Sequence, residues 1–135
     1  MGLLPFAYSE GVLYVKRRIL EETKAHLLRE HPKEAVGLWA GRREVEALVP
    51  LPNVHERPLV AYRADPLAVL RALKALEAQG LGLLAIYHSH PQGPAWPSET
   101  DRKEAYWRVP YVIFGTDGFR AFLLPEGREV EIVVV

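Results

Sequence analysis

The chain has 135 residues, and 17 lysine and arginine residues balance 17 aspartate and glutamate residues, so its formal net charge is zero. A hydrophobic fraction of 49% at this length predicts one globular domain over residues 1–135 with a sizeable core. Zero net charge argues against binding of nucleic acid or an anionic membrane through bulk charge. The absence of cysteine excludes disulfides, a thiol nucleophile and every zinc site that needs thiolates.

No segment is typical of membrane insertion or export. The longest apolar stretch, Leu81–Tyr87, is far shorter than the roughly 20 residues of a membrane-spanning helix. The N-terminal residues lack the basic start, long apolar run and cleavage site of a signal peptide, so we expect a cytoplasmic protein. A single asparagine and two glutamines are typical of thermophile proteins, although a biased genomic base composition would give similar counts.

The first predicted elements are a strand and a helix. The apolar run Gly11–Val15 predicts the strand. Over residues 16–30 apolar side chains recur at the spacing of one helical face, and Pro32 ends this helix. His26 and His31 lie on or just after the helix, and we expect both to be solvated.

A hairpin follows. The apolar runs Ala35–Ala40 and Glu44–Pro50 are joined by Gly41–Arg43, a pattern that indicates two antiparallel strands. Trp39 lies on the first of them and is expected to pack in the core. Leu59–Arg63 is a further strand candidate.

The next helix has the clearest end signals. Asp65 can cap it, Pro66 suits its first position, and Gly80 stands where a glycine commonly ends a helix. Its buried stripe is predicted from four leucines: Leu67, Leu70, Leu73 and Leu76.

The C-terminal half contains a central strand, a helix and three further strands. Leu81–Tyr87 is apolar almost throughout, which predicts a strand buried on both faces. Ser98 can cap a helix that runs to about Trp107. The remaining strand candidates are Tyr111–Gly115, Phe119–Leu124 and Glu129–Val135, the last being either an inner strand or a self-association edge. The pattern predicts an α/β protein with a mixed sheet and three helices.

The most informative residues follow the central strand. His88 and His90 are two positions apart, so in an extended segment both rings point to the same side and can approach one ion. Asp101 lies in the first turn of the next helix, where the helix dipole favours a carboxylate, and could supply a third ligand. Zinc accepts two imidazoles and a carboxylate, and three protein ligands leave a fourth position for water, as in catalytic sites.

Hydrolysis also needs groups that handle protons and negative charge. Glu34, at the start of the hairpin, is the candidate base, and Ser98 is a candidate donor to an oxyanion. Each residue also has a plainer interpretation. Ser98 and Asp101 fit a capping box, the histidines could be a hydrogen-bonded surface pair, and Glu34 could be a solvated turn residue.

Together, Glu34 and His88-x-His90-x₇-Ser98-x₂-Asp101 resemble the motif of the JAMM (MPN+) zinc metalloprotease family. The segments EAVGLWAG, LVPLPN and LLAIYHSHP also resemble that family's glutamate-bearing strand, the strand and turn after it, and the approach to the histidines. The resemblance implies that His88, His90 and Asp101 bind zinc, that Glu34 is the general base, and that Ser98 stabilises the tetrahedral intermediate. It also implies a curved mixed β-sheet flanked by helices, similar to cytidine deaminases. A deaminase is excluded because the chain has neither cysteine nor a His-x-Glu pair.

The resemblance also implies a substrate. Family members cleave peptide or isopeptide bonds, often where the C-terminal Gly-Gly of a ubiquitin-like protein joins an amine. The segments Asn53–Arg63 and Pro91–Pro97 are short, so ubiquitin clamps are not expected, and the chain is similar to small stand-alone prokaryotic members. The predicted partner is a ubiquitin-like modifier or sulfur carrier whose tail pairs with a strand edge. Trp96 is a candidate wall of the substrate groove.

Two other functions stay open at this point. A non-catalytic MPN module would serve as a scaffold. Scaffolding, however, does not require all five site residues to be present. A zinc hydrolase of small peptides or amides would share the site chemistry and differ in its groove. The oligomeric state is not specified by any pattern in the sequence.

Overall fold

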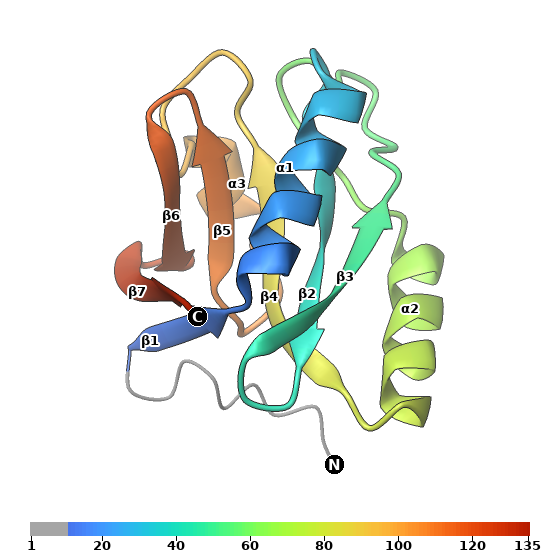
Figure 1. Ribbon diagram of the computed structural model, residues 1–135. Helices are drawn as coiled ribbons and strands as arrows, with labels where there is room; N and C mark the ends of the chain where they lie inside the picture. The colour runs from blue at the N-terminus through green and yellow to red at the C-terminus, as the bar shows by residue number, and fades with distance from the viewer. Residues whose placement is uncertain (1–10) are drawn as a thin grey trace.

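Seven strands close into a small barrel in the computed structural model, which describes residues 11–135 (Figure 1). The spatial order is β1-β3-β2-β4-β5-β6-β7, with β1 parallel to both β3 and β7, β4 parallel to β5, and the other pairs antiparallel. The predicted α/β fold with a curved mixed sheet and three helices is confirmed, and the curvature is strong enough to bring the two ends of the sheet together. The elements are β1 (Val12–Val15), α1 (Arg17–Glu30), β2 (Val36–Gly41), β3 (Val45–Leu51), α2 (Pro66–Ala78), β4 (Gly82–Ser89), α3 (Glu99–Lys103), β5 (Tyr111–Gly115), β6 (Gly118–Leu123) and β7 (Arg128–Val134).

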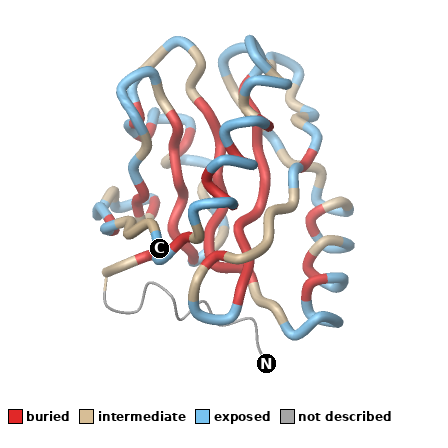
Figure 2. Tube along the Cα trace, viewed as in Figure 1, coloured by how far each residue is buried: buried red, intermediate tan, exposed pale blue. Residues whose placement is uncertain are grey.

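The centre of the sheet is formed by β2 and β4, which are buried along almost their whole length (Figure 2). Helices α1 and α2 cover opposite faces of these strands. Ile19 and Leu20 of α1 pack with Trp39, whereas Val69 and Leu73 of α2 pack in a separate apolar cluster. A strand between two helical layers must be apolar on both faces, which explains the unbroken apolar run in β4.

The last strand has a partner on each side. β7 pairs with β6 and with β1, so it is an inner strand of the barrel and not a self-association edge. Closure between β1 and β3 rests on one residue pair, Val15 and Val45. No other described strand pairs with the outer edge of β3 beyond that point.

Three predictions about individual elements are wrong. Residues 59–63 form turns and irregular backbone, with a single bridge between Asn53 and Ala64, because side-chain hydrogen bonds satisfy this backbone instead of a neighbouring strand. In α2 the buried face begins at Val69, while Leu67 and Leu70 are each 51% exposed. The buried positions 69, 73 and 76 follow the i, i+4, i+7 spacing of a true helical face.

The third helix is shorter than predicted. It ends at Lys103 rather than near Trp107, and the backbone N–H groups of Tyr106 and Trp107 donate to the Tyr111 hydroxyl at 3.0 and 2.9 Å. A side chain from β5 therefore replaces the helical acceptors. At the ends of α2, Asp65 makes no side-chain capping bond, whereas Gly80 lies just beyond the helix, as predicted, with a positive φ of 77°.

The prediction that His26 is solvated is also wrong. His26 is 3% exposed, because it lies on the same buried face of α1 as Ile19 and Thr23, at the i, i+4, i+7 spacing. Its Nδ1 lies 2.7 Å from the Tyr87 hydroxyl. His31 is exposed, as predicted.

Of the helices within residues 11–135, none has both the length and the apolar character required to cross a bilayer.

Candidate metal centre

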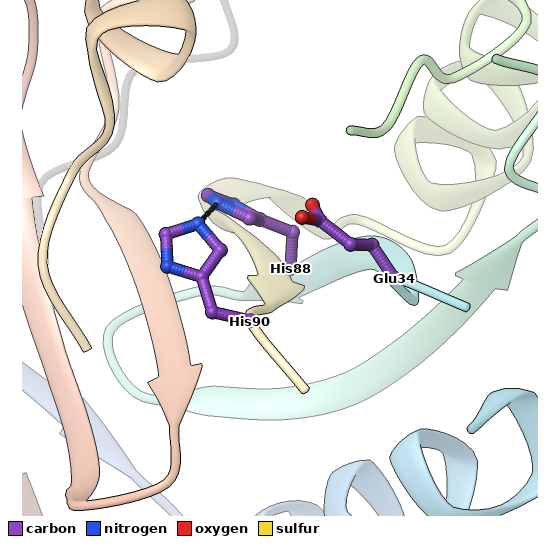
Figure 3. Close-up of side chains that lie close together, drawn as sticks. All are labelled: Glu34, His88 and His90. Atoms are coloured by element: carbon purple, nitrogen blue, oxygen red, sulfur yellow. Dashed lines mark hydrogen bonds between the residues drawn. The ribbon is translucent and has the colours of Figure 1, made fainter. Parts of the chain in front are cut away.

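The two histidines lie at the C-terminal end of β4 and face the same space (Figure 3). His88 is inside the strand and fully buried, and His90 is one residue beyond its end. Their Nε2 atoms are 3.3 Å apart, with ring centroids 5.0 Å apart. The predicted convergence of both rings on one point is therefore present.

Asp101 meets the histidines from α3. Its Oδ2 atom lies 3.2 Å from Nε2 of His88 and 3.1 Å from Nε2 of His90. The same oxygen accepts a hydrogen bond from the backbone N–H of Ser98 at 2.9 Å, and the Ser98 hydroxyl accepts one from the N–H of Asp101 at 2.9 Å. The capping box is thus real, and it also aims the Asp101 carboxylate at the histidine pair.

The three converging atoms have the spacing of a tetrahedral metal site. Zinc bonds of about 2.0–2.1 Å at tetrahedral angles separate neighbouring ligand atoms by about 3.3–3.4 Å. The separations of 3.1, 3.2 and 3.3 Å among the two Nε2 atoms and Oδ2 are close to that value. Two imidazole nitrogens and a carboxylate oxygen also form a donor set that zinc accepts. The residues present could therefore hold such an ion.

Glu34 lies beside this cluster and is 5% exposed. The register that pairs Val36 of β2 with His88 of β4 brings Glu34 there. Its carboxylate lies within 4.8 Å of one ring nitrogen from each histidine, so Glu34 could be an alternative third ligand. The closer spacing of Asp101 favours Asp101 as the ligand and leaves Glu34 next to the centre.

The electrostatics differ between the two carboxyl groups. Burial raises the pKa of Glu34 to about 7, with His90 lowering it and Asp101 raising it further. Burial also works against ionisation of Asp101, but hydrogen bonds from His88 and His90 outweigh it and hold the pKa of Asp101 well below its usual range. One carboxyl group is therefore suited to exchange a proton near neutral pH, while the other stays ionised.

The two histidines also differ. Burial lowers the pKa of His88 despite its hydrogen bond with Asp101. Burial acts in the same direction on His90, but hydrogen bonds with Asp101 and with the Pro94 carbonyl oxygen outweigh it and raise the pKa of His90. The Nδ1 atom of His90 lies 3.0 Å from that oxygen, which can only accept, so Nδ1 carries the proton and Nε2 is directed to the cluster.

Three residues near the site were not singled out from the sequence. The Tyr62 ring stacks on His88 with centroids 4.3 Å apart, Pro94 orients His90, and Asn53 bonds the carbonyl oxygen of Glu34. Asn53 does carry a signal in the sequence, because it is the single asparagine of the chain and ends the LVPLPN segment. Tyr62 carries none, because nothing in its segment indicates a contact with β4.

Two clefts flank the cluster. The larger, of about 450 Å³, has mainly apolar walls and includes Ser98 and Asp101 in its lining. The smaller, of about 350 Å³, includes His90 in its lining.

Trp39 is fully buried, as predicted, whereas Trp96 is 51% exposed and packs edge-on against Phe122. Trp96 lines neither of these two clefts.

Comparison with known proteins shows close relatives. The chain is 73% identical over 134 residues to a probable TtuB-protein conjugate cleaving protease of Thermus thermophilus, covering 99% of this chain and 90% of the relative. It is 38% identical over 104 residues to a desampylase of Haloferax volcanii, covering 74% and 75% of the two chains. It is 35% identical over 97 residues to a CysO-cysteine peptidase of Mycobacterium tuberculosis, covering 70% and 66%.

Solved structures show the same fold. A protein from Desulfitobacterium hafniense superimposes with a TM-score of 0.82 at 32% identity, covering 91% of this chain and 92% of that one. A JAB1/MPN domain protein from Archaeoglobus fulgidus superimposes with a TM-score of 0.65 at 19% identity, covering 92% and 98%.

The family itself is also matched. A family model described as prokaryotic homologues of the JAB domain matches residues 16–125. With relatives named as proteases and peptidases, this match confirms the predicted family resemblance and the prediction of a hydrolytic enzyme. The chain therefore belongs to the family of prokaryotic homologues of the JAB domain.

Proposed function

We propose that this protein is a zinc-dependent peptidase or isopeptidase that cleaves the bond after the C-terminal glycine of a ubiquitin-like modifier or sulfur carrier. The observation that carries the proposal is the convergence of His88, His90 and Asp101 within 3.1–3.3 Å of one another, with buried Glu34 beside them. Relatives named for cleavage of TtuB-protein conjugates and of CysO-cysteine support the substrate class. The expected cytoplasmic location and the single domain over residues 1–135 stay predictions.

His88, His90 and Asp101 would hold the zinc ion. When bound there, zinc supplies a Lewis acid that lowers the pKa of a water molecule and polarises the scissile carbonyl group. Asp101 contributes the negative charge because its pKa is held low, and His88 contributes a neutral imidazole because burial keeps its pKa low.

Glu34 is the residue proposed to move protons. Its buried carboxylate would accept a proton from the attacking water and return it to the leaving amine. In the metal-free protein burial raises the pKa of Glu34 to about 7, so this carboxyl group can take up and release a proton near neutral pH. Ser98 would stabilise the oxyanion. Its hydroxyl oxygen accepts from the N–H of Asp101, so its own proton is available to donate.

The surroundings suit an extended polypeptide better than a small amide. Clefts lie on both sides of the centre, one lined in part by Asp101 and the other by His90. A substrate polypeptide could therefore extend in both directions from the cleaved bond. The outer edge of β3 pairs with β1 at Val45 alone, and we propose this edge for pairing with the tail. A zinc hydrolase of small peptides would need neither feature.

Incubation with conjugates tests this function. Ubiquitin-like proteins from the same source, linked through the C-terminal glycine to a peptide amine or to cysteine, are incubated with the zinc-loaded protein and analysed by mass spectrometry. We expect release of the intact modifier. Cleavage of short peptides without cleavage of any conjugate would favour the small-peptide hydrolase.

Glu34→Ala separates chemistry from metal binding. This variant should retain one zinc ion per chain but lose turnover by about 100-fold or more, since a positioned general base typically contributes about 100- to 10,000-fold. Zinc content and the rate of conjugate cleavage are measured on the same sample. Wild-type turnover by Glu34→Ala would contradict the role of Glu34, and a wild-type protein without stoichiometric zinc would contradict the proposed function.

A further inference from the structure

Asn53 is the single asparagine of the chain, and its side-chain amide makes four hydrogen bonds. Its Nδ2 donates to the carbonyl oxygens of Glu34 at 2.9 Å and Ala61 at 3.0 Å. Its Oδ1 accepts from the N–H groups of His55 and Arg63, both at 3.0 Å. A neutral amide has two donor hydrogens and two acceptor lone pairs, so the full capacity of this side chain is used.

These bonds close residues 53–64 into a compact segment, which we call the 53–64 loop. The loop contains no regular strand, and its two ends meet at the bridge between Asn53 and Ala64 and at the bond from the Val54 N–H to the Arg63 carbonyl oxygen at 2.9 Å. Short backbone ladders of this kind are weak by themselves. The amide of Asn53 crosses the inside of the loop and holds both of its sides.

The same loop holds Glu34 through its main chain at two points. The Glu34 carbonyl oxygen accepts from Asn53, and the Glu34 N–H donates to the Pro58 carbonyl oxygen at 2.7 Å. Glu34 precedes β2, so the ladder of the sheet does not supply these bonds. The loop therefore supplies the hydrogen bonds of both main-chain groups of Glu34, while the next residue, Ala35, is bonded to Ser89 of β4.

The loop also reaches the histidines and the larger cleft. Tyr62 stacks on His88, with the two rings inclined by 25°. Val60, Tyr62 and Ala64 line the same cleft as Ser98 and Asp101. One segment thus contacts the proposed base, a proposed ligand and the proposed substrate cleft.

We infer that Asn53 is a positioning residue for the reaction: it locks the 53–64 loop against Glu34 and so fixes the base relative to His88 and the larger cleft. This inference rests on the proposed function. Aspartate has nearly the same shape but no donor hydrogen, and it would place a carboxylate oxygen 2.9 Å from the Glu34 carbonyl oxygen. Since small misplacements of catalytic groups can reduce rates by up to about 100-fold, we expect a measurable catalytic effect.

The test compares two variants of Asn53 with a matched control. Asn53→Asp keeps the acceptor side of the amide and loses the donors to Glu34 and Ala61, whereas Asn53→Ala loses all four bonds. Thr23→Val is the control, because buried Thr23 also makes two hydrogen bonds, to Trp39 and to the Ile19 carbonyl oxygen, but within the α1 side of the core. All proteins are loaded with zinc and assayed at 25 °C.

Three measurements are made: kcat and KM on a modifier conjugate, zinc content, and amide hydrogen exchange. We expect Asn53→Asp to lower kcat about tenfold with zinc still stoichiometric. Asn53→Ala should speed exchange at the N–H groups of Glu34, His55 and Arg63 by about tenfold or more. Thr23→Val should lower the melting temperature without either effect.

Two results would overturn the inference. Unchanged exchange at those amides in Asn53→Ala would show that Asn53 does not lock the loop. A kcat of Asn53→Asp no lower than that of Thr23→Val would show that the lock does not position the base. If the wild-type protein has no zinc and no turnover, the proposed function fails, while the exchange measurement still decides whether Asn53 locks the loop.

Discussion

His88 and His90 are two residues apart, and the protein holds them by different means. His88 is fully buried, lies against Tyr62, and its Nδ1 has no hydrogen-bond partner within residues 11–135. The side chain of His90 is 13% exposed, and its Nδ1 donates to Pro94. Histidine ligands are commonly oriented by a hydrogen bond from the second ring nitrogen. In this protein such a hydrogen bond orients His90, whereas packing against Tyr62 orients His88.

The support of His90 extends to the turn between β5 and β6. The Asp117 carboxylate accepts from the N–H of Ala95, next to Pro94, at 2.8 Å. The N–H of Thr116 donates to the Gly93 carbonyl oxygen at 2.8 Å. A side chain on Gly115 would clash with the backbone of Pro94 and Ala95, so the loop rests directly on that glycine. The two histidines should therefore respond to different substitutions.

Loss of Asp101, which contacts both histidines, should have the largest effect. Asp101→Ala should weaken zinc binding by more than about 100-fold, since even outer partners of metal ligands cost 10–100-fold. Asp101→Asn is the matched control, because its amide oxygen can still accept from the Ser98 N–H and keep the cap. We expect both variants to lose zinc and Asp101→Asn to keep more of the metal-free stability. Titration with a competing chelator and thermal unfolding measure this, and tight zinc binding by either variant would exclude Asp101 as a ligand.

The support of His88 by packing is tested at Tyr62. Tyr62→Ala should lower the free energy of unfolding by about 2–3 kcal/mol, because it removes the ring through which the 53–64 loop packs on His88. Tyr62→Phe keeps the ring and should stay close to wild type. Denaturant unfolding of the metal-free proteins measures the difference. A loss as large in Tyr62→Phe would mean that the hydroxyl group, and not the ring, supports His88.

The support of His90 by hydrogen bonds is tested at Asp117. Asp117→Ala should weaken zinc binding by about tenfold, because the loop that carries the Pro94 carbonyl oxygen loses an anchor. Asp117→Asn retains an acceptor and should restore most of the affinity. Glu46→Ala removes a carboxylate that also accepts a turn N–H, from Arg42, and should leave zinc affinity unchanged. Equal affinities in all three variants would remove the distinction between the two histidines.

The smallest effect is expected at His26, which bonds Tyr87 next to His88. Burial lowers the pKa of His26, so below pH 6.5 the unfolded chain binds a proton that the folded chain resists, and stability falls as the pH falls. The slope from one group cannot exceed about 1.4 kcal/mol per pH unit. His26→Gln keeps a polar partner for Tyr87 and should flatten the slope. Unfolding free energies between pH 5 and pH 8 check this, and an unchanged slope would assign the dependence to other groups.

Local patterns were sufficient for much of the fold and for the spacing of the centre. The two-residue period of a strand put both histidine rings on one side, and the capping box placed Asp101 in the first turn of α3. Such patterns depend on backbone geometry over a few residues, which neighbours in the sequence control. The same reasoning failed for residues 59–63 and for His26, since their environments come from segments distant in the sequence.

The sequence by itself determined the residue types of the centre, the absence of thiolate ligands and the order of the helices and strands, apart from the strand wrongly predicted at residues 59–63. Only the tertiary structure decided that Glu34 lies beside His88, because this depends on the antiparallel register of β2 and β4 across more than 50 residues of chain. It also decided that Tyr62 stacks on one histidine and Pro94 orients the other. These contacts join segments whose own residues carry no sign of their partners, since strand register and loop packing are set by the whole core.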